Sequence, residues 1–495
     1  MEDQKKFYAR IASITFEKFR NIEYGEVKFP NGKVDDFYNG ESSVLGIYGQ
    51  KGSGKTSVIM AMNIVKSVLL GFEIFHEGLI KKDRETSKLV FGFSIYDSDD
   101  NKYNAKYSFE LFNAPDQDED IDIELESQHQ PNKPKATIGI KNETIEYDGI
   151  SSDGNKIRHK VLLSTLEEFC ANGTKAFGTK ANTTQDTEYN SLTNNDNMTI
   201  AMLLNRKKDS LEQKKSFLFY KDVHELISSN MKNEHDNNVY RCLAIFGAFI
   251  ITSGMGEAGI VNFGDLPLNI FDYSESNGKI FQFRHAIKLD KEITLIDTTA
   301  EKFEHQFNKI NSVISKLIPG INIYLKCKET VPFEKDPQRT VKKFELFSER
   351  NGIEMPLRYE SSGIRRLISF MSVLITAYNF PSITFAIDEF DSGIFEDLLG
   401  RLISIFAETG KGQLIFTSHN LRPLEVLEDD NIIFTTVNCK NKFLKLSKRG
   451  NSNLRDMFLR AIKLGGTTEK LYNYPDEYEM ELALALAARG ETNGQ

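Results

Sequence analysis

The sequence predicts an α/β protein whose main sheet is parallel and has helices on both faces. Continuous apolar stretches alternate with helical patterns, which is typical of strands that are buried on both sides. The apolar strands are expected at 44–48, 383–387 and 413–417, and the helices that alternate with them at 55–70, 363–379 and 393–408. A Gly-rich loop joins the first of these strands to the first of these helices.

Antiparallel strands are predicted beside this sheet. Residues 7–29 alternate apolar and polar side chains in two runs around Arg20 and Asn21, which indicates an N-terminal hairpin. The same alternation occurs in 88–112 and 136–148. The whole sheet system is therefore expected to be mixed, with an N-terminal antiparallel β-subdomain.

A largely helical insertion with polar loops is predicted in the middle of the chain. The polar segments 113–135 and 172–198 are expected to be surface loops, because few of their residues are suited to burial. Helical patterns occur at 199–204, 209–231, 237–252 and 299–318, and alternating runs follow at 321–327 and 341–348. The predicted division is 1–150 for an N-terminal lobe, 151–300 for the insertion, 301–440 for a C-terminal lobe and 441–495 for a basic, helical extension.

The composition predicts a soluble globular protein of the cytoplasm. Of the 495 residues, 40% are hydrophobic and 27% are charged, close to globular averages. The net charge of −9 argues against a protein that coats nucleic acid without selectivity. The four cysteines form no Cys-x-x-Cys pattern, so neither a zinc knuckle nor a disulfide framework is expected. The longest apolar run, 243–251, is too short to span a membrane, and the N-terminus has no signal-peptide pattern.

A phosphate-binding loop is expected between the first apolar strand and the first helix. Its eight residues fit the pattern G-x-x-x-x-G-K-[ST]: Gly49, Gln50, Lys51, Gly52, Ser53, Gly54, Lys55 and Thr56. The glycines let backbone N–H groups and the helix N-terminus point at phosphate oxygens. Lys55 is expected to reach the β- and γ-phosphates of ATP, and the Thr56 hydroxyl to bind Mg²⁺. In this strand–helix context the pattern predicts an ATP site.

Two carboxylates and a histidine are expected near this loop. Asp388 and Glu389 directly follow the strand at 383–387, and His419 follows the strand at 413–417. Ligands of an open α/β sheet bind at the carboxyl ends of its strands, so the two acids form a Walker B element. Asp388 is a predicted Mg²⁺ ligand, and Glu389 is predicted to polarise the attacking water. A strand-end histidine by itself is more often structural.

These elements, with Ser361, Ser362 and Gly363 at a helix start between them, resemble the ATP-binding-cassette ATPases. The similarity is to the branch that includes the structural-maintenance-of-chromosomes heads, RecF and the OLD-family ATPases, and it implies an ABC-type P-loop NTPase head. It also implies that the Ser361 segment is the signature, which closes the ATP site of a second subunit. The second serine stands where the family usually has glycine. A homodimer, or a larger even-numbered oligomer, is therefore expected.

The resemblance assigns further residues to the site. Glu389 and His419 would be catalytic, with His419 as the switch histidine, and Asp391 would lie in the segment that contacts the partner subunit. The run Lys18-Phe19-Arg20-Asn21 is similar to the strand end that supports the nucleotide in RecF-like heads. The nucleotide-binding set implied by the family is thus the phosphate-binding loop with Ser57, Lys18, Arg20 and Asn21.

Within this branch the sequence looks most like ATPases of phage-defence operons. The runs 418–425 and 453–456 are similar to the ATPase component of AbiL-type abortive-infection systems and to the sensor ATPase of PARIS systems. That likeness implies a nuclease-like effector protein encoded by a neighbouring gene, and a phage-derived trigger. OLD-family ATPases have a C-terminal nuclease with an Asp-x-Asp pair, and no Asp-x-Asp follows His419. ATP hydrolysis is therefore the only chemistry expected of this chain.

A second function stays open at the level of the sequence. The chain would then be a DNA-repair or chromosome-maintenance ATPase of the RecF or SMC type, with ATP clamping two heads around DNA. The segment 431–470, with nine basic and two acidic side chains, fits contact with nucleic acid or an acidic partner, but such a run is more often a solvated face. The acidic overall charge and the absence of a long heptad pattern favour the switch over the DNA clamp.

Overall fold

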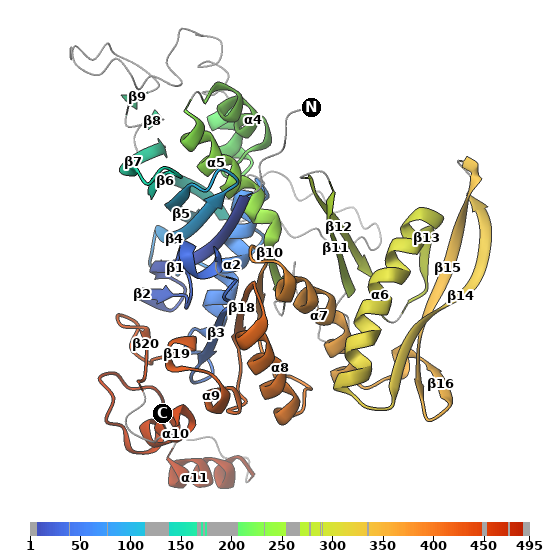
Figure 1. Ribbon diagram of the computed structural model, residues 1–495. Helices are drawn as coiled ribbons and strands as arrows, with labels where there is room; N and C mark the ends of the chain where they lie inside the picture. Colours follow the sequence, from blue (N-terminus) through green and yellow to red (C-terminus); the bar gives the residue numbers. More distant parts are fainter. Residues whose placement is uncertain are drawn as a thin grey trace, which may run out of the picture.

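The computed structural model shows an α/β body with a separate β-rich lobe on one side (Figure 1). The structure describes residues 7–38, 40–76, 78–113, 138–165, 170–171, 174–175, 206–231, 233–253, 268–276, 279–287, 289, 291–333, 336–447, 453–473 and 476–488. The predicted loop 113–135 lies outside these residues except for Asn113. The predicted loop 172–198 also lies outside them, except for Thr174 and Lys175.

A six-stranded sheet forms the centre of the body, in the order β10-β17-β18-β3-β19-β20. Its strands are β3 (Ser43–Tyr48), β10 (Ile250–Ser253), β17 (Thr384–Ile387), β18 (Gln413–Thr417), β19 (Ile432–Thr435) and β20 (Phe443–Leu444). All neighbours are parallel except β19 and β20. Every residue of β3, β17, β18 and β19 is buried, which explains why these strands are apolar except at their ends. The predicted parallel sheet is confirmed.

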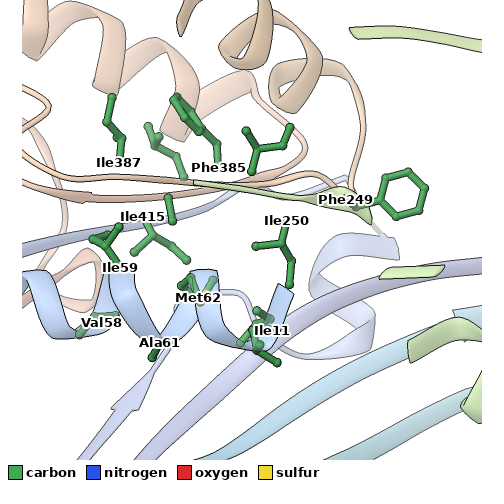
Figure 2. Packing of buried hydrophobic residues seen from close by; sticks show 14 of the residues in the cluster. Ile11, Val58, Ile59, Ala61, Met62, Phe249, Ile250, Phe385, Ile387 and Ile415 are labelled. Carbon is green, nitrogen blue, oxygen red and sulfur yellow. The ribbon is translucent and has the colours of Figure 1, made fainter. Parts of the chain in front are cut away.

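Helices cover both faces of this sheet. Figure 2 shows α2 (Lys55–Leu69) on one side, and helices of the C-terminal half, coloured orange, on the other. The C-terminal half supplies α7 (Ser362–Asn379), which packs on β17, and α8 (Glu396–Thr409), which packs on β3. Apolar side chains such as Ile59 and Met62 of α2 meet the sheet in a fully buried core (Figure 2). All three helices were predicted to within three residues at their ends, so the fold class is confirmed.

An eight-stranded antiparallel sheet packs beside the central sheet, in the order β2-β1-β4-β5-β6-β7-β8-β9. Its strands are β1 (Phe7–Phe19), β2 (Ile22–Lys28), β4 (Thr86–Asp97), β5 (Lys102–Asn113), β6 (Ile138–Ile150), β7 (Lys156–Ser164), β8 (Cys170–Ala171) and β9 (Thr174–Lys175). A short helix, α1 (Val34–Tyr38), follows β2. The predicted N-terminal hairpin is confirmed: β1 and β2 pair up to Phe19 and Ile22, which leaves Arg20 and Asn21 as the turn.

The insertion is mixed rather than largely helical. Its described helices are α4 (Lys221–Asn230), α5 (Glu234–Phe246) and the 3-10 turn η1 (Gly247–Phe249), and strands β7 to β13 account for much of the rest, including β11 (Leu268–Ser276), β12 (Lys279–Ile287) and β13 (Ile293–Ile296). The predicted helix 237–252 was wrong at its end. Ile250, Ile251 and Thr252 leave the helix and pair with β17, because β-branched residues in a short apolar run suit a buried parallel strand.

The separate lobe consists of one helix on a small antiparallel sheet, at the right of Figure 1. It contains α6 (Asp297–Leu317), β14 (Ile321–Phe333), β15 (Asp336–Arg350), β16 (Ile353–Pro356) and the 3-10 turn η2 (Leu357–Tyr359), and β13 completes the sheet. The predicted helix at 299–318 and the alternating runs are confirmed, although β14 and β15 are longer than the runs. The lobe leads directly into the Ser361 segment at the start of α7.

The C-terminal extension returns to the body beside β19. After β18 come α9 (Pro423–Val426) and the 3-10 turn η3 (Asp429–Asn431), and after β20 come α10 (Leu454–Leu464) and α11 (Glu477–Ala488). Figure 1 shows α10 and α11 together at the bottom of the molecule, in red. Among the helices that the structure describes, none has the length and apolar character needed to cross a membrane.

Candidate nucleotide-binding site

The loop between β3 and α2 is shaped by glycines. Gly49, Gly52 and Gly54 have backbone φ angles of 146, 75 and 106°, a region that residues other than glycine rarely adopt. A Cβ atom on Gly49 would lie 2.0 Å from Oγ1 of Thr435, so this position also lacks space for a side chain. The loop ends at Gly54, the N-cap of α2, where the helix dipole and free N–H groups favour an anion.

Lys55 lies buried at the start of α2. Its Nζ donates to the carbonyl oxygens of Gly49, at 2.8 Å, and Gln50, at 3.1 Å. Burial lowers the pKa of Lys55, while the carboxylates of Asp388 and Glu389 act in the opposite direction. The two hydrogen bonds of this buried ammonium group go to neutral carbonyl oxygens. A negatively charged phosphate in the loop would therefore form a stronger, charge-assisted interaction with Lys55.

The turn of the N-terminal hairpin supports this loop. Asn21 Nδ2 donates to the carbonyl oxygen of Gly52 at 2.7 Å, so the hairpin turn and the loop are joined directly. Burial lowers the pKa of Arg20, and nearby Asp388 partly offsets this. Arg20 and Lys18 have φ angles of 51 and 55°, a left-handed conformation that gives the strand end its sharp turn. Lys18 itself is exposed.

The other predicted loop residues differ in their access to solvent. Lys51 is exposed and Thr56 is partly buried. Ser57 is 1% exposed, and its N–H donates to the carbonyl oxygen of Gly54 at 3.1 Å. The predicted contact of Ser57 with a nucleotide therefore requires its buried hydroxyl to face the site.

The two acids after β17 are held by the neighbouring strands. Asp388 is 7% exposed, and its N–H donates to the carbonyl oxygen of Ser253 at the end of β10, at 3.0 Å. The Thr417 hydroxyl donates to Asp388 Oδ1 and accepts the N–H of Glu389, at 2.8 Å for the latter. Glu389 has a φ angle of 48°, an unusual conformation for glutamate. Residues in strained conformations persist where surrounding contacts enforce them, and this is common at functional sites.

His419 lies next to these acids, after β18. Asp391 Oδ2 accepts the backbone N–H groups of His419, at 3.1 Å, and Asn420, at 3.0 Å. Burial is the main cause that lowers the pKa of His419, and the positive charge of Lys55 lowers it further. Asp391 and Glu389 oppose this, and the net effect is a lowered pKa. His419 is thus neutral at physiological pH, with one ring nitrogen able to donate and the other able to accept.

A buried arginine connects α7 to the acids. Arg366 is 2% exposed, and its guanidinium donates to the carbonyl oxygens of Asp388, at 3.1 Å, and Glu389, at 2.5 Å. Burial lowers the pKa of Arg366 to about 10, while Glu389, Asp391 and Asp388 act to raise it. The sequence analysis gave this residue no role. The signal in the sequence was a charged pair, Arg365 and Arg366, in an otherwise uncharged helix.

The predicted signature segment lies at the exposed start of α7. Ser361 is the N-cap, and its hydroxyl accepts the N–H of Ile364 at 3.3 Å. Ser361 and Ser362 are exposed, and among the described residues no hydrogen bond joins them to the phosphate-binding loop. A Cβ atom on Gly363 would lie 2.1 Å from the carbonyl oxygen of Gly393, so only glycine permits this close backbone approach. One subunit thus brings together the loop, the two acids and His419, but not the signature.

Comparison with known proteins identifies the family. A model of the AAA ATPase domain matches residues 10–422. The chain belongs to this family. Similar solved structures include the Smc head domain from Pyrococcus furiosus, at 13% identity over 89% of this chain and 96% of that chain with a TM-score of 0.35. They also include the SMC head domain from Thermotoga maritima, at 12% identity over 89% and 100% with a TM-score of 0.35, and a nucleotide complex of the recombination mediator RecF, at 12% over 90% and 100% with a TM-score of 0.33. Among curated proteins, none matches.

The residues of this AAA ATPase fit ATP with Mg²⁺. A glycine loop with a buried lysine offers N–H groups and a positive charge to phosphate oxygens. The hydroxyl of Thr56 and the carboxylate of Asp388 are the hard oxygen donors that Mg²⁺ prefers, and these two residues would hold it. The bound ion would neutralise charge that develops on the phosphates.

Two contacts between the phosphate-binding loop and the C-terminal part of the chain were missed by the sequence analysis. The hydroxyl groups of Ser53 and Thr435 lie 2.5 Å apart, which ties the phosphate-binding loop to β19. The backbone N–H of Asn473 donates to Oε1 of Gln50 at 3.0 Å, which ties the loop to the segment before α11. No sequence pattern marks these contacts, because they join residues hundreds of positions apart.

Proposed function

We propose that this AAA ATPase is a switch in which ATP joins two copies of the chain and hydrolysis separates them. The state of the pair would control an effector protein, and the setting would be defence against phage. The ATPase chemistry rests on the site just described. The switch, the effector and the defence role rest on the resemblance of the sequence motifs, and experiments must test them.

A single observation supports the proposal best: Lys55, Asp388, Glu389 and His419 follow three adjacent parallel strands at one end of the sheet. In a hydrolysis step, Lys55 would bind the phosphates, and the Glu389 carboxylate would orient the attacking water and accept its proton. Neutral His419 would donate a hydrogen bond to the phosphoryl oxygens. Thr417 and Arg366 would hold the two acids in place before the substrate arrives.

The separation of the predicted signature from the rest of the site supports dimerisation. Ser361 and Ser362 are exposed, and two large aromatic residues close to them in the fold are also exposed. Tyr359 is 72% exposed and Phe395 is 76% exposed. Exposed aromatic side chains around a polar segment are typical of surfaces that bind another protein. We infer that this face closes on the ATP site of a second copy.

Mixing two inactive variants tests the dimer. Lys55→Ala removes the phosphate-binding charge, and Ser361→Arg blocks the signature, so each variant alone should show little phosphate release. A mixed dimer regains one complete site, formed by the intact loop of the Ser361→Arg chain and the intact signature of the Lys55→Ala chain. At equal amounts we expect about a quarter of the wild-type rate, since half of the dimers are mixed and each has one of two sites. Wild-type activity of Ser361→Arg alone would contradict a shared site.

The effector role calls for a separate experiment in the host cell. The proposal is that the neighbouring gene encodes a nuclease-like partner and that a phage product triggers its release or activation. Protection against phage should require both genes, and Glu389→Gln, which retains ATP, should alter protection without loss of the protein. Equal protection by the effector gene alone would contradict control by this ATPase.

A further inference from the structure

Lys442, in the turn 436–442 that joins β19 to β20, is a buried lysine without an acidic partner among the described residues. Its side chain is 3% exposed, and its ammonium group forms no hydrogen bond or ion pair with the part of the chain that the structure describes. Burial lowers the pKa of Lys442, Cys439 acts in the opposite direction, and the positive charge of Lys81 lowers it further. A buried charge without a partner is unfavourable, so an anion from outside the chain would stabilise this lysine.

The lysine lies against the phosphate-binding loop. A Cβ atom on Gly54 would lie 3.1 Å from Cε of Lys442, and at the same distance from Oδ1 of Asn21. Gly54 is the N-cap of α2, where free N–H groups and the helix dipole favour an anion. Since Cε carries the ammonium nitrogen, the charge of Lys442 lies at the anion-binding end of α2. A helix N-terminus and a buried cation therefore meet at one point.

The charged neighbours of Lys442 differ from those of Lys55. Lys81 acts on the pKa of Lys442, whereas Asp388 and Glu389 act on that of Lys55. The two acids mark the end of the site at which water attacks the γ-phosphate. Neither acid acts on Lys442, so its ammonium group lies toward the other end of the phosphate chain, where a nucleotide has its α-phosphate.

Hydrogen bonds fix the turn 436–442 that carries this lysine. The N–H of Thr436 donates to the carbonyl oxygen of Lys442 at 2.8 Å, and its hydroxyl donates to the carbonyl oxygen of Asn441 at 2.6 Å. The carbonyl oxygen of Cys439 accepts the N–H of Glu23 at 2.7 Å. The turn is therefore joined to the N-terminal hairpin, which itself supports the phosphate-binding loop.

The C-terminal part of the chain holds the same turn from the other side. The carboxylate of Glu469 accepts the side-chain N–H groups of Asn438, at 2.9 Å, and Asn441, at 3.0 Å. These two hydrogen bonds lower the pKa of Glu469. The N–H of Val437 donates to the carbonyl oxygen of Lys470 at 2.9 Å. A single carboxylate thus connects both asparagines of the turn to the segment before α11.

We propose that Lys442 is a second phosphate-binding lysine, which contacts the α-phosphate of the bound nucleotide, and that Glu469 positions it through the turn. The proposal rests on the ATP binding of the proposed function, and not on the dimer, the effector or the defence role. ATP and ADP share the α-phosphate, so Lys442 contributes equally to the binding of both. The C-terminal part of the chain thereby takes part in nucleotide binding.

The first test measures the dissociation constants of ATP and ADP by calorimetry, with the full chain. Lys442→Met retains an unbranched stem beside Gly54 but removes the charge. Both constants should rise by the same factor, about tenfold or more, because one charge-assisted interaction with a phosphate is lost. Lys440→Met is the matched control: Lys440 lies in the same turn but is exposed, and its replacement should leave both constants unchanged.

Thermal unfolding without nucleotide separates this role from a structural one. Lys442→Met removes a buried charge that has no partner and retains the packing of the stem, so the melting temperature should stay level or rise. A lower melting temperature would show that the lysine serves the fold, and it would overturn the proposal.

A double-mutant cycle tests the positioning role of Glu469. Glu469→Ala in the wild-type chain should raise the dissociation constants of ATP and ADP, because the turn loses two hydrogen bonds. In the Lys442→Met chain the same substitution should have no further effect, since it acts only through the lysine. Equal effects in both chains would show that Glu469 does not position Lys442.

The remaining outcomes distinguish this inference from the proposed function. If Lys442→Met binds both nucleotides with wild-type affinity, the inference is wrong and the proposed function stands. If only ATP binds more weakly, the lysine contacts the γ-phosphate, and the assignment to the α-phosphate is overturned. If the wild-type protein itself binds no ATP, both the inference and the proposed function are wrong.

Discussion

The Thr417 hydroxyl is the group through which the acids of the site are most readily tested. It donates to the Asp388 carboxylate and accepts the N–H of Glu389 at 2.8 Å, so it fixes both residues at once. Valine has nearly the same shape but neither donates nor accepts. Thr417→Val should therefore remove two hydrogen bonds without leaving a cavity.

The expected loss of stability depends on the polar groups that lose their hydrogen-bond partner in Thr417→Val. A hydrogen bond to a charged group contributes about 1.5–3 kcal/mol, and an N–H left without a partner costs about 1–3 kcal/mol. Part of this loss is recovered by water, because Glu389 is exposed. We expect the unfolding free energy of the protein to fall by about 3 kcal/mol. We also expect kcat to fall at least about tenfold, because a loss of ~1.4 kcal/mol of transition-state stabilisation lowers a rate tenfold.

Urea unfolding followed by circular dichroism measures the first quantity, and steady-state phosphate release measures the second. Thr376→Val is the control, because Thr376 is also buried and its hydroxyl donates to the Ser372 carbonyl oxygen within α7, away from the two acids. That substitution should cost less than about 1 kcal/mol and leave kcat unchanged, since the carbonyl has a second partner in the helix. If Thr417→Val matched wild type in kcat, the Thr417 contacts would not organise the catalytic acids.

Three further predictions concern the same site. Lys55→Ala should weaken ATP binding at least about hundredfold in calorimetry, because a charge on the phosphates is lost; unchanged affinity would remove Lys55 from the site. The pKa of His419 is lowered from 6.5, so activity should stay level through neutral pH and fall only in more acidic solution as the ring becomes charged. His419→Gln should abolish that acidic limb, and an identical pH profile would count against His419. Arg366→Met should reduce kcat more than ATP affinity, with exposed Arg460→Met as the control.

The sequence was sufficient for those parts of the fold in which local pattern and burial agree. β3, β17 and β18 are buried on both faces, so their apolar runs could be read directly. The phosphate-binding loop was recognised because only glycine tolerates the φ angles at Gly49 and Gly54. The placement of Asp388 and His419 at the ends of neighbouring strands followed from the apolar runs before them, whereas the role predicted for His419 came from the family resemblance.

The sequence was insufficient to predict those parts of the fold and the site whose structure depends on contacts between residues far apart in the chain. The strand β10 was predicted as helix, because the apolar run 243–251 continues the pattern of α5 into the first two residues of the strand, and only pairing with β17 reveals the strand. The role of Thr417 required knowing that its hydroxyl faces the next strand end. The contact of Asn473 with Gln50 joins the phosphate-binding loop to a residue 423 positions away that no sequence pattern marks. In each case a partner far along the chain determines the structure.

These distant contacts also explain how a signal from the signature would reach the catalytic acid. Ser361 is the N-cap of α7, and Arg366 of the same helix donates to the carbonyl oxygen of Glu389. Glu389 holds a left-handed backbone conformation, whose cost of about 1–3 kcal/mol is sustained by its neighbours. In the proposed dimer, a second subunit that docks at Ser361 and displaces α7 would act on the backbone of Glu389 through the Arg366 guanidinium. Since α7 is a packed helix and Arg366 is buried, we expect hydrolysis to depend on the docked state.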